Sequence, residues 1–305
     1  MKLTFKVTES YAGKTTYTVL RREFGCSASL VRRLKRSDGI AVNGISVFSN
    51  HVLALGDIVS ADVTAAEPPC GIVPEHKKID ILYESEGLIA VNKPCGILVH
   101  PSRSKYTGTL ANFVAGYLLD AEGSGVCHAV NRLDRDTSGV VLFARNSYMK
   151  DISARALSES SVKRYIAIVH GVFDEPSGVI SLPIKRFEEG NMLRVVSSDG
   201  KQAVTRYETI MTGAIHGEAV SVLRLTLETG RTHQIRVHCL ACGHPLLGDT
   251  LYYNDRSAEL SEHLGIHAQA LHASTLSFKD PLTRRFETIN APLVREDMKN
   301  IAAAL

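Results

Sequence analysis

The chain has 305 residues, of which 44% are apolar and 22% are charged, the balance of an ordinary globular protein. This composition excludes an intrinsically disordered chain, and the six cysteines are too widely spaced for a disulfide framework, so we expect reduced thiols. No stretch approaches about 18 uninterrupted apolar residues and the N-terminus lacks a secretory apolar segment, which predicts a cytoplasmic protein without a membrane span.

The small net charge of +3 hides a basic N-terminal segment. Residues 1–65 contain nine lysines and arginines against five acidic residues, whereas the other 240 residues contain 26 basic and 27 acidic side chains. A locally basic domain is the usual electrostatic footprint of a polyanion partner. We therefore expect residues 1–65 to form a compact domain that contacts a polyanion.

Within this domain, Ser27 is expected to cap a helix whose apolar residues lie on one side. The basic residues of the same helix are Arg32, Arg33, Lys35 and Arg36. The pair Asn43-Gly44, between two short apolar runs, predicts a tight hairpin directly afterwards. A basic helix beside a hairpin suits a phosphate backbone, although the same pattern also fits a solvated helix surface.

Residues 66–78 contain three prolines and few apolar residues, which predicts a linker. From residue 79 to residue 305 the sequence has many short β-type runs and few helical segments, of which 153–158 and 293–305 are examples. This pattern is typical of an α+β domain on a mixed, mainly antiparallel sheet. It does not fit a regular βαβ repeat.

Two local patterns resemble ligand sites but lack the required spacing. Gly13-Lys14-Thr15 is not preceded by the earlier glycine of a phosphate loop, because position 8 is Thr8. The His and Cys cluster in residues 238–244 has no second pair of ligands, so we expect its small thiols to pack in the core. The sequence predicts neither a metal site nor a nucleotide or other cofactor.

Two dense polar stretches are candidates for an active site. Residues 131–139 carry four charged and three small polar side chains directly before an apolar strand, which indicates a polar loop at a sheet edge. Residues 229–238 alternate polar and apolar side chains and predict a half-buried strand, in which Arg236 shares a face with Gln234 and His238. A guanidinium buried on such a strand needs a carboxylate partner.

The order of these motifs resembles the RluA family of RNA pseudouridine synthases, preceded by an S4-like RNA-binding domain. Residues 131–139 match the H-R-L-D-x-x-T-S-G signature of that family, and residues 230–238 match its G-R-T-H-Q-I-R-V-H segment. Further matching segments are Asn92–Gly96, Val99–Pro101, Lys163–Gly171, Gly243–Asp249 and Leu271–Ala273. One position departs from the family pattern, because Asn131 stands where the family usually has His. The S4-like resemblance covers residues 11–63 and is weaker.

The resemblance implies an isomerase that cleaves the N-glycosidic bond of a uridine within RNA and rejoins the base through carbon. Asp134 would be the nucleophile by its place in the motif, and Arg236 would lie beside it and favour its ionised form. Tyr165 would pack against the target uracil and serve in proton transfer at C5. Arg132 would fill the space that the extruded uridine leaves in the RNA, and the basic N-terminal residues would contact phosphates.

The substrate and two other classes of function remain open at this point. An S4-like domain favours 23S rRNA over tRNA, by analogy with relatives that carry one. A non-catalytic RNA-binding or assembly protein is disfavoured by the intact Asp134, Tyr165 and Arg236. A glycoside hydrolase using Asp134 with Asp136 is disfavoured because alternate residues of an extended segment point to opposite sides. We expect a monomer.

Overall fold

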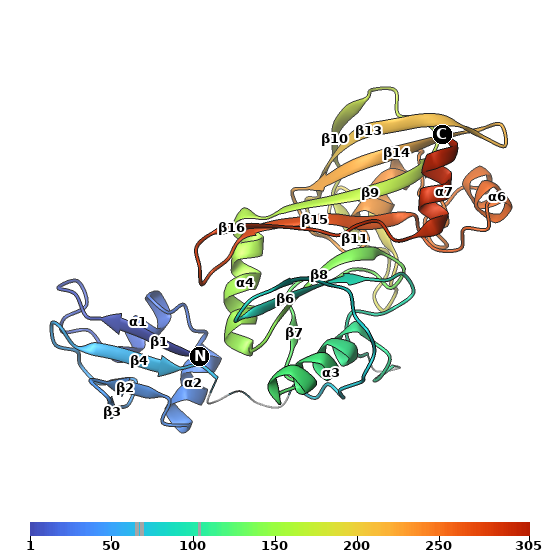
Figure 1. The fold of residues 1–305 in the computed structure, drawn as a ribbon. Helices are drawn as coiled ribbons and strands as arrows, with labels where there is room; N and C mark the ends of the chain where they lie inside the picture. The colour runs from blue at the N-terminus through green and yellow to red at the C-terminus, as the bar shows by residue number, and fades with distance from the viewer. Residues whose placement is uncertain (65–66, 68–69, 103–104) are drawn as a thin grey trace.

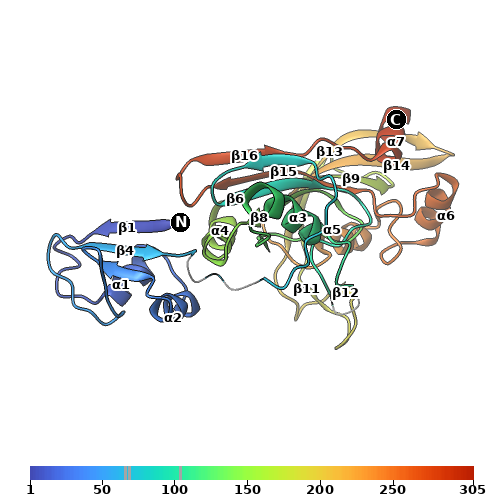
Figure 2. The same cartoon turned by 60° about the horizontal axis from the view of Figure 1, so that its bottom comes forward.

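The computed structural model describes residues 1–64, 67, 70–102 and 105–305. Residues 66, 68 and 69 of the expected linker therefore lie outside the described residues. The chain forms a small N-terminal unit and a larger unit built on a ten-stranded sheet, shown in two views in Figures 1 and 2. Within the described residues, no helix is both long enough and apolar enough to span a bilayer.

The N-terminal unit is a four-stranded sheet in the order β1-β4-β2-β3, accompanied by two helices. Its elements are β1 (Lys2–Lys6), α1 (Thr16–Arg22), α2 (Ala28–Arg36), β2 (Ile40–Val42), β3 (Ile45–Ser46) and β4 (Ile58–Asp62). Ser27 caps α2, accepting a hydrogen bond from the Leu30 amide at 3.3 Å. Asn43 and Gly44 both have positive φ, at 50° and 83°, as a tight hairpin turn of the expected kind requires.

The larger unit contains a sheet in the order β10-β13-β14-β9-β15-β8-β6-β5, to which β16 and β7 add at β15 and β8. Only the pairing of β15 with β8 is parallel among these strands. Its first strands are β5 (Ile81–Glu84), β6 (Leu88–Lys93), β7 (His128–Ala129), β8 (Ser138–Ala144), β9 (Val162–His170) and β10 (Ser177–Ser181). The others are β13 (Val204–Ile215), β14 (Glu218–Leu227), β15 (Leu271–Lys279) and β16 (Phe286–Asn290). The expected α+β fold on a mainly antiparallel sheet is confirmed.

A separate two-stranded hairpin pairs β11 (Ile184–Arg186) with β12 (Arg194–Val196). The helices of this unit are α3 (Leu110–Glu122), α4 (Ser147–Ser160), α5 (Gln234–Ala241), α6 (Asp255–His263) and α7 (Glu296–Ala304). The expected helical segment at 153–158 is part of α4, and the one at 293–305 contains α7, which begins only at Glu296. Figure 2 shows α3, α5 and the β11–β12 hairpin on the same side of the sheet.

Alternating side chains of the central strands bury both faces of the sheet. On β6, Leu88 and Ala90 pack in one apolar cluster with residues of α4, whereas Ile89 and Val91 pack in another with residues of α3. Because β6 and β8 are covered on both faces, every one of their residues is buried. Such strands are mostly apolar and do not alternate between apolar and polar residues. Fully buried central strands give a rigid support for the loops at their ends.

The N-terminal unit packs directly against α4 of the larger unit, as both views show (Figures 1 and 2). The Tyr148 hydroxyl donates to the Phe24 carbonyl at 2.9 Å, and Arg155 donates to the Gly25 carbonyl at 2.6 Å. Buried apolar residues of both units belong to one continuous cluster. Glu67 adds a polar contact, since its carboxylate accepts from the Ser147 amide and lies 2.9 Å from His128.

Candidate active site

Asp134 lies in the loop between β7 and β8, on a turn closed by a hydrogen bond from the Thr137 amide to its carbonyl at 3.2 Å. The neighbouring Leu133 packs against two of the apolar clusters and so anchors the loop to the sheet. The Asp134 side chain is 29% exposed. The structure thus holds its backbone in place while leaving the carboxylate accessible.

Arg236 lies on helix α5, which corrects the expectation of a strand at residues 229–238. In the helix, Gln234 and His238 are one turn apart and both hydrogen-bond to Thr205, at 3.0 Å and 2.9 Å. Arg236 therefore does not share their face, and its guanidinium points elsewhere, to Asp134 and Asp249. The alternation of polar residues was misleading because the polar side chains are also buried.

The expectation that Arg236 needs a carboxylate partner is met twice over. Its Nε and Nη2 donate to the two oxygens of Asp249, both at 2.7 Å, and its Nη1 donates to Oδ2 of Asp134 at 3.1 Å. The Arg236 side chain is 5% exposed and that of Asp249 is 0% exposed. Burial disfavours the guanidinium charge, but the hydrogen bonds and charges of the two carboxylates outweigh it and raise the pKa of Arg236.

Asp249 is a site residue that the sequence reasoning did not assign a role. It orients Arg236 through a bidentate ion pair, and its Oδ1 also accepts from the amides of Leu251 and Tyr252. Because Asp249 binds two nitrogens of the guanidinium, Nε and Nη2, the third nitrogen, Nη1, is left to contact Asp134. The Gly248-Asp249 segment of the matched motif was the available signal.

Tyr165 lies on β9 and is buried. Burial, followed by the negative charge of Asp134, raises the pKa of Tyr165 well above its ordinary value, so the phenol stays protonated at neutral pH. Leu133, the neighbour of Asp134, packs against the apolar cluster that contains Tyr165, which places the loop of Asp134 near Tyr165. Gly139, at the start of β8, and Ala273 on β15 support this proximity, because their strands pair beside β9.

His233 adjoins Asp134, and Tyr252 adjoins His233 and Arg236; neither was expected as a site residue. His233 Nε2 lies 3.8 Å from Oδ2 of Asp134, and its Nδ1 hydrogen-bonds with the Tyr252 hydroxyl at 2.9 Å. The Tyr252 ring also stacks with the Arg236 guanidinium at 4.9 Å. Burial lowers the pKa of His233, which keeps its imidazole neutral at neutral pH.

Lys93 supports the loop of Asp134 through hydrogen bonds to backbone carbonyls. Its buried Nζ donates to the carbonyls of Pro94, Ile97 and Arg135, at 2.9, 2.8 and 2.7 Å. Burial lowers the pKa of Lys93 to about 8, so the ammonium still predominates at pH 7. One side chain thereby connects the matched segment at residues 92–96 to the residue that follows Asp134.

Asn131, which departs from the family pattern, serves the backbone of β8. Its amide donates to the Val140 carbonyl at 3.2 Å and accepts from the Leu142 amide at 2.7 Å. A neutral amide has one donor group and one acceptor for these two partners. The substitution therefore leaves the loop connected to its strand.

Arg132 is exposed in the same loop as Asp134. Burial lowers the pKa of His100, and the charge of Arg132 lowers it further. Asp136 differs from Asp134, because its carboxylate accepts from the exposed Arg135 at 2.8 Å. In the described part of the chain, no hydrogen bond or ion pair joins Asp136 to Arg236. The two aspartates therefore occupy different environments.

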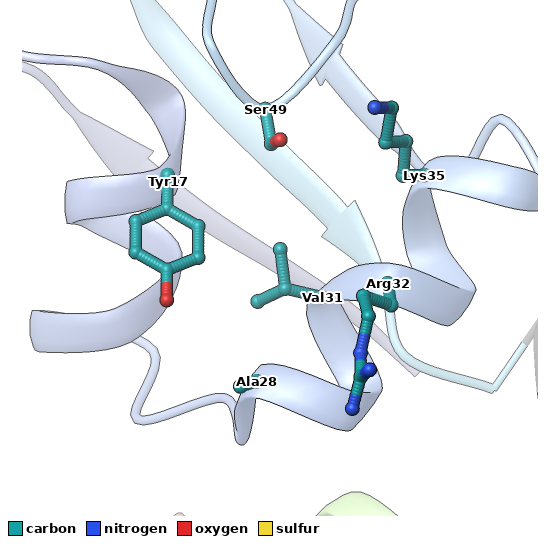
Figure 3. Close-up of a pocket in the computed structure, with 6 residues that line it drawn as sticks. All are labelled: Tyr17, Ala28, Val31, Arg32, Lys35 and Ser49. Atoms are coloured by element: carbon teal, nitrogen blue, oxygen red, sulfur yellow. The ribbon is translucent and has the colours of Figure 1, made fainter.

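The four basic residues of α2 fall into two groups. Arg32, Lys35 and Arg36 are exposed, and none of them forms an ion pair with a described carboxylate. Arg32 and Lys35 border a hollow of about 260 Å³ between α1 and α2 (Figure 3). Its lining residues are Tyr17, Ala28, Val31, Arg32, Lys35 and Ser49. Arg33, by contrast, is turned towards the larger unit and donates to the Ser147 hydroxyl.

No cluster of three His, Cys, Asp or Glu side chains is arranged to hold a metal ion among the residues that the structure describes. In the cluster at 238–244, Cys239 is fully buried in an apolar cluster and Cys242 packs against it. His238 donates or accepts at both ring nitrogens within the fold, with Thr205 and the Leu182 carbonyl as partners.

Comparison with known proteins identifies relatives of this chain. A family model described as RNA pseudouridylate synthase matches residues 87–241, which include Asp134, Tyr165 and Arg236. The uncharacterized RNA pseudouridine synthase YhcT of Bacillus subtilis is 36% identical over 297 residues, covering 97% of this chain and 94% of the relative. The ribosomal large subunit pseudouridine synthase D of Blochmanniella floridana is 32% identical over 277 residues, covering 85% and 84%.

Solved structures are similar to about three quarters of the chain. Human RNA Pseudouridylate Synthase Domain Containing 1 superposes with a TM-score of 0.59 at 26% identity, covering 74% of this chain and 86% of that chain. Human RNA Pseudouridylate Synthase Domain Containing 4 gives a TM-score of 0.57 at 25% identity, covering 73% and 92%.

Proposed function

Since the chain belongs to the RNA pseudouridylate synthase family, we propose that Asp134 is its nucleophile and that its substrate is RNA of the large ribosomal subunit. The protein is an isomerase acting on uridines in RNA. The reaction breaks the N1–C1′ bond of uridine and forms a C5–C1′ bond. The uracil loses a proton at C5 and gains one at N1, so the composition of the RNA does not change.

The contact of Arg236 with Asp134 at 3.1 Å carries the assignment of the nucleophile. Arg236 engages only Oδ2, and Oδ1 has no hydrogen-bond partner among the described residues. A carboxylate is a suitable nucleophile for this reaction because it can both form and leave a covalent adduct. The bidentate pair of Arg236 with Asp249 keeps the guanidinium neutralised when Asp134 loses its charge in an adduct.

Tyr165 and Arg132 complete the proposed mechanism around the target nucleotide. A buried, protonated phenol beside Asp134 offers a face on which the uracil stacks and an oxygen for proton transfer at C5. A uridine in a helix must be extruded at a cost of about a few kcal/mol. Arg132, exposed beside the loop, fills the vacated space, since a planar guanidinium stacks like a base.

The choice of substrate rests on the relatives. The ribosomal large subunit pseudouridine synthase D of Blochmanniella floridana aligns over 84% of its length. We propose that residues 1–65 form an S4-like domain that binds this RNA through Arg32, Lys35 and Arg36, because these cations have no described carboxylate partner. A tRNA substrate is the second candidate. The monomeric state and the cytoplasmic location stay predictions.

The first prediction tests nucleophile and substrate together. Unmodified 23S rRNA and bulk tRNA are incubated with the wild-type protein or with Asp134→Asn, and pseudouridines are mapped by carbodiimide-blocked reverse transcription. We expect stops on 23S rRNA that depend on Asp134, while Asp134→Asn keeps its affinity for RNA because the amide is isosteric. Stops that persist with Asp134→Asn would contradict the role of Asp134 as nucleophile. Stops found only on tRNA would make tRNA the substrate in place of 23S rRNA. Wild-type binding without any stops would favour a non-catalytic RNA-binding protein.

A further inference from the structure

His233 occupies an unusual position at the start of α5. It is the N-cap residue of the helix with a φ of 57°, a left-handed backbone conformation that is uncommon for a residue with a Cβ atom. Its side chain is 8% exposed and lies between Asp134 and Tyr252. A residue held in such a conformation costs free energy, and such residues concentrate at functional sites.

The hydrogen bonds around Tyr252 determine which imidazole nitrogen of His233 carries the proton. The Tyr252 hydroxyl accepts from the backbone amide of Arg194 on β12 at 2.8 Å. Among the described residues, Nδ1 of His233, at 2.9 Å, is the hydrogen-bond acceptor within reach of the hydroxyl proton, so the hydroxyl donates to Nδ1. In the neutral imidazole the proton is then on Nε2, the nitrogen that lies 3.8 Å from Oδ2 of Asp134.

We propose that His233 is a positioning residue for Asp134, with Tyr252 linking it to the β11–β12 hairpin. This inference rests on the proposed role of Asp134 as nucleophile. The Nε2–H and Arg236 Nη1 approach the same oxygen, Oδ2. Together they would select the carboxylate rotamer that leaves Oδ1 free to react.

The present distance of 3.8 Å is longer than a hydrogen bond. A movement of Asp134 by about 1 Å would close the contact to hydrogen-bonding length, and catalytic contacts commonly tighten when substrate binds. Binding of the uridine therefore supplies the step that completes the contact. Misplacement of a reacting group by a distance of this size can cost about 100-fold in rate.

The structure predicts a distinct dependence on pH. The groups around the imidazole are Asp134, Asp249, Arg194, Arg236 and the Tyr252 hydroxyl. Burial lowers the pKa of His233, so the imidazole is neutral at pH 7. It becomes charged only as the pH falls below the ordinary pKa of a histidine side chain. A charged His233 pairs with Asp134 and competes with its attack on substrate, so the rate decreases on the acid side.

The test measures single-turnover release of tritium from RNA transcribed with uridine tritiated at C5, using 23S rRNA and bulk tRNA sequences, and RNA affinity by filter binding. We expect His233→Ala to lower the rate about 10- to 100-fold with RNA affinity within about twofold. His233→Gln, whose amide retains an N–H donor, should recover most of the rate and lose the histidine part of the acid-side decrease. Tyr252→Phe keeps the ring on Arg236 and should reduce the rate about five- to tenfold.

His170→Gln is the matched control, because it removes another buried imidazole, which pairs with Glu218 at the end of β9. Rates of His233→Ala and Tyr252→Phe within twofold of wild type, with Asp134→Asn inactive, would overturn the positioning role and leave the proposed function intact. An active Asp134→Asn would instead refute the proposed nucleophile. If His233→Ala does not fold, His233→Gln and Tyr252→Phe carry the test, and an unchanged acid-side decrease in His233→Gln would contradict it.

Discussion

The carboxylate of Asp134, the proposed nucleophile, depends on a small number of buried ionic groups that each have several partners. Arg236 bridges Asp249 and Asp134, and Lys93 holds the backbone on which Asp134 is carried. Leaving one of these partners unpaired in the interior costs more than the net value of the hydrogen bond itself. The geometry of the site is therefore sensitive to single side chains that never touch the substrate.

Lys93→Met tests this sensitivity at one residue. Met fills a similar volume, but the carbonyls of Pro94, Ile97 and Arg135 lose their shared donor. We expect the unfolding free energy to fall by about 3 kcal/mol, since an unsatisfied buried polar group costs about 1–3 kcal/mol, and the single-turnover rate to fall about tenfold or more. Thermal unfolding and tritium release measure the two effects.

Lys299→Met is the control for that substitution. Lys299 is exposed and pairs with Glu296 on the surface, so its loss should change stability by less than about 0.5 kcal/mol. Equal stability of Lys93→Met and the wild-type protein would show that the three carbonyls find other partners, such as water, and that Lys93 does not support the loop.

Among the helices, strands and turns, the sequence predicted caps and tight turns correctly but did not predict every helix and strand. Ser27, Asn43 and Gly44 behave as expected because caps and tight turns depend on a few adjacent residues. The alternation at residues 229–238 predicted a strand, and the segment is helix α5, because tertiary contacts bury its polar side chains too. Local periodicity cannot distinguish an amphipathic strand from a short helix that is buried all round.

The candidate site shows the same limit. Asp134, Tyr165 and Arg236 were found through the resemblance of long motifs, and the need of Arg236 for a carboxylate followed from elementary electrostatics. That Asp249 supplies this carboxylate could be seen only in the fold, since Asp249 lies thirteen positions after Arg236 and beyond the end of α5. His233 was missed because its role depends on a partner that the chain brings to it only after folding.

Gly139 tests how the strands position the site. Its φ is 113°, and a Cβ atom there would overlap the backbone of Ala273, where β8 runs parallel to β15. We expect Gly139→Ala to destabilise the protein by about 3 kcal/mol or more, because neither backbone can move without disturbing β9, which carries Tyr165. Thermal unfolding measures the loss. Gly230→Ala is the control, since a Cβ atom at Gly230 meets no neighbouring atom, and similar melting of both variants would contradict the packing argument.

For the whole molecule, the contact between the N-terminal unit and α4 places the proposed RNA-binding surface of α2 relative to the site of Asp134. Tyr148, Arg155 and a shared apolar cluster join the two units. The exposed cations of α2 are therefore held at a constant separation from Asp134. If α2 binds phosphates as proposed, an RNA that contacts both sites must present its target uridine at a matching distance, and we expect this separation to influence the choice of substrate.

The last prediction separates the two groups of basic residues on α2. The combined change of Arg32, Lys35 and Arg36 to Gln should weaken RNA binding and reduce the slope of log affinity against log salt by about 2 to 3, one phosphate contact for each cation. Arg33→Gln should leave the slope nearly unchanged and lower stability, because Arg33 contacts Ser147.

The control for the triple variant changes three other exposed cations, Lys150, Arg256 and Lys279, to Gln and removes the same charge. Equal salt slopes for the two triple variants would show that net charge, and not the α2 surface, attracts the RNA. A slope reduced only in the α2 variant, together with slower tritium release at subsaturating protein, would place part of the substrate's phosphate backbone on α2 during catalysis. Because a shared apolar cluster and hydrogen bonds join the two units, binding at α2 and entry of the uridine at Asp134 would then be parts of one recognition event.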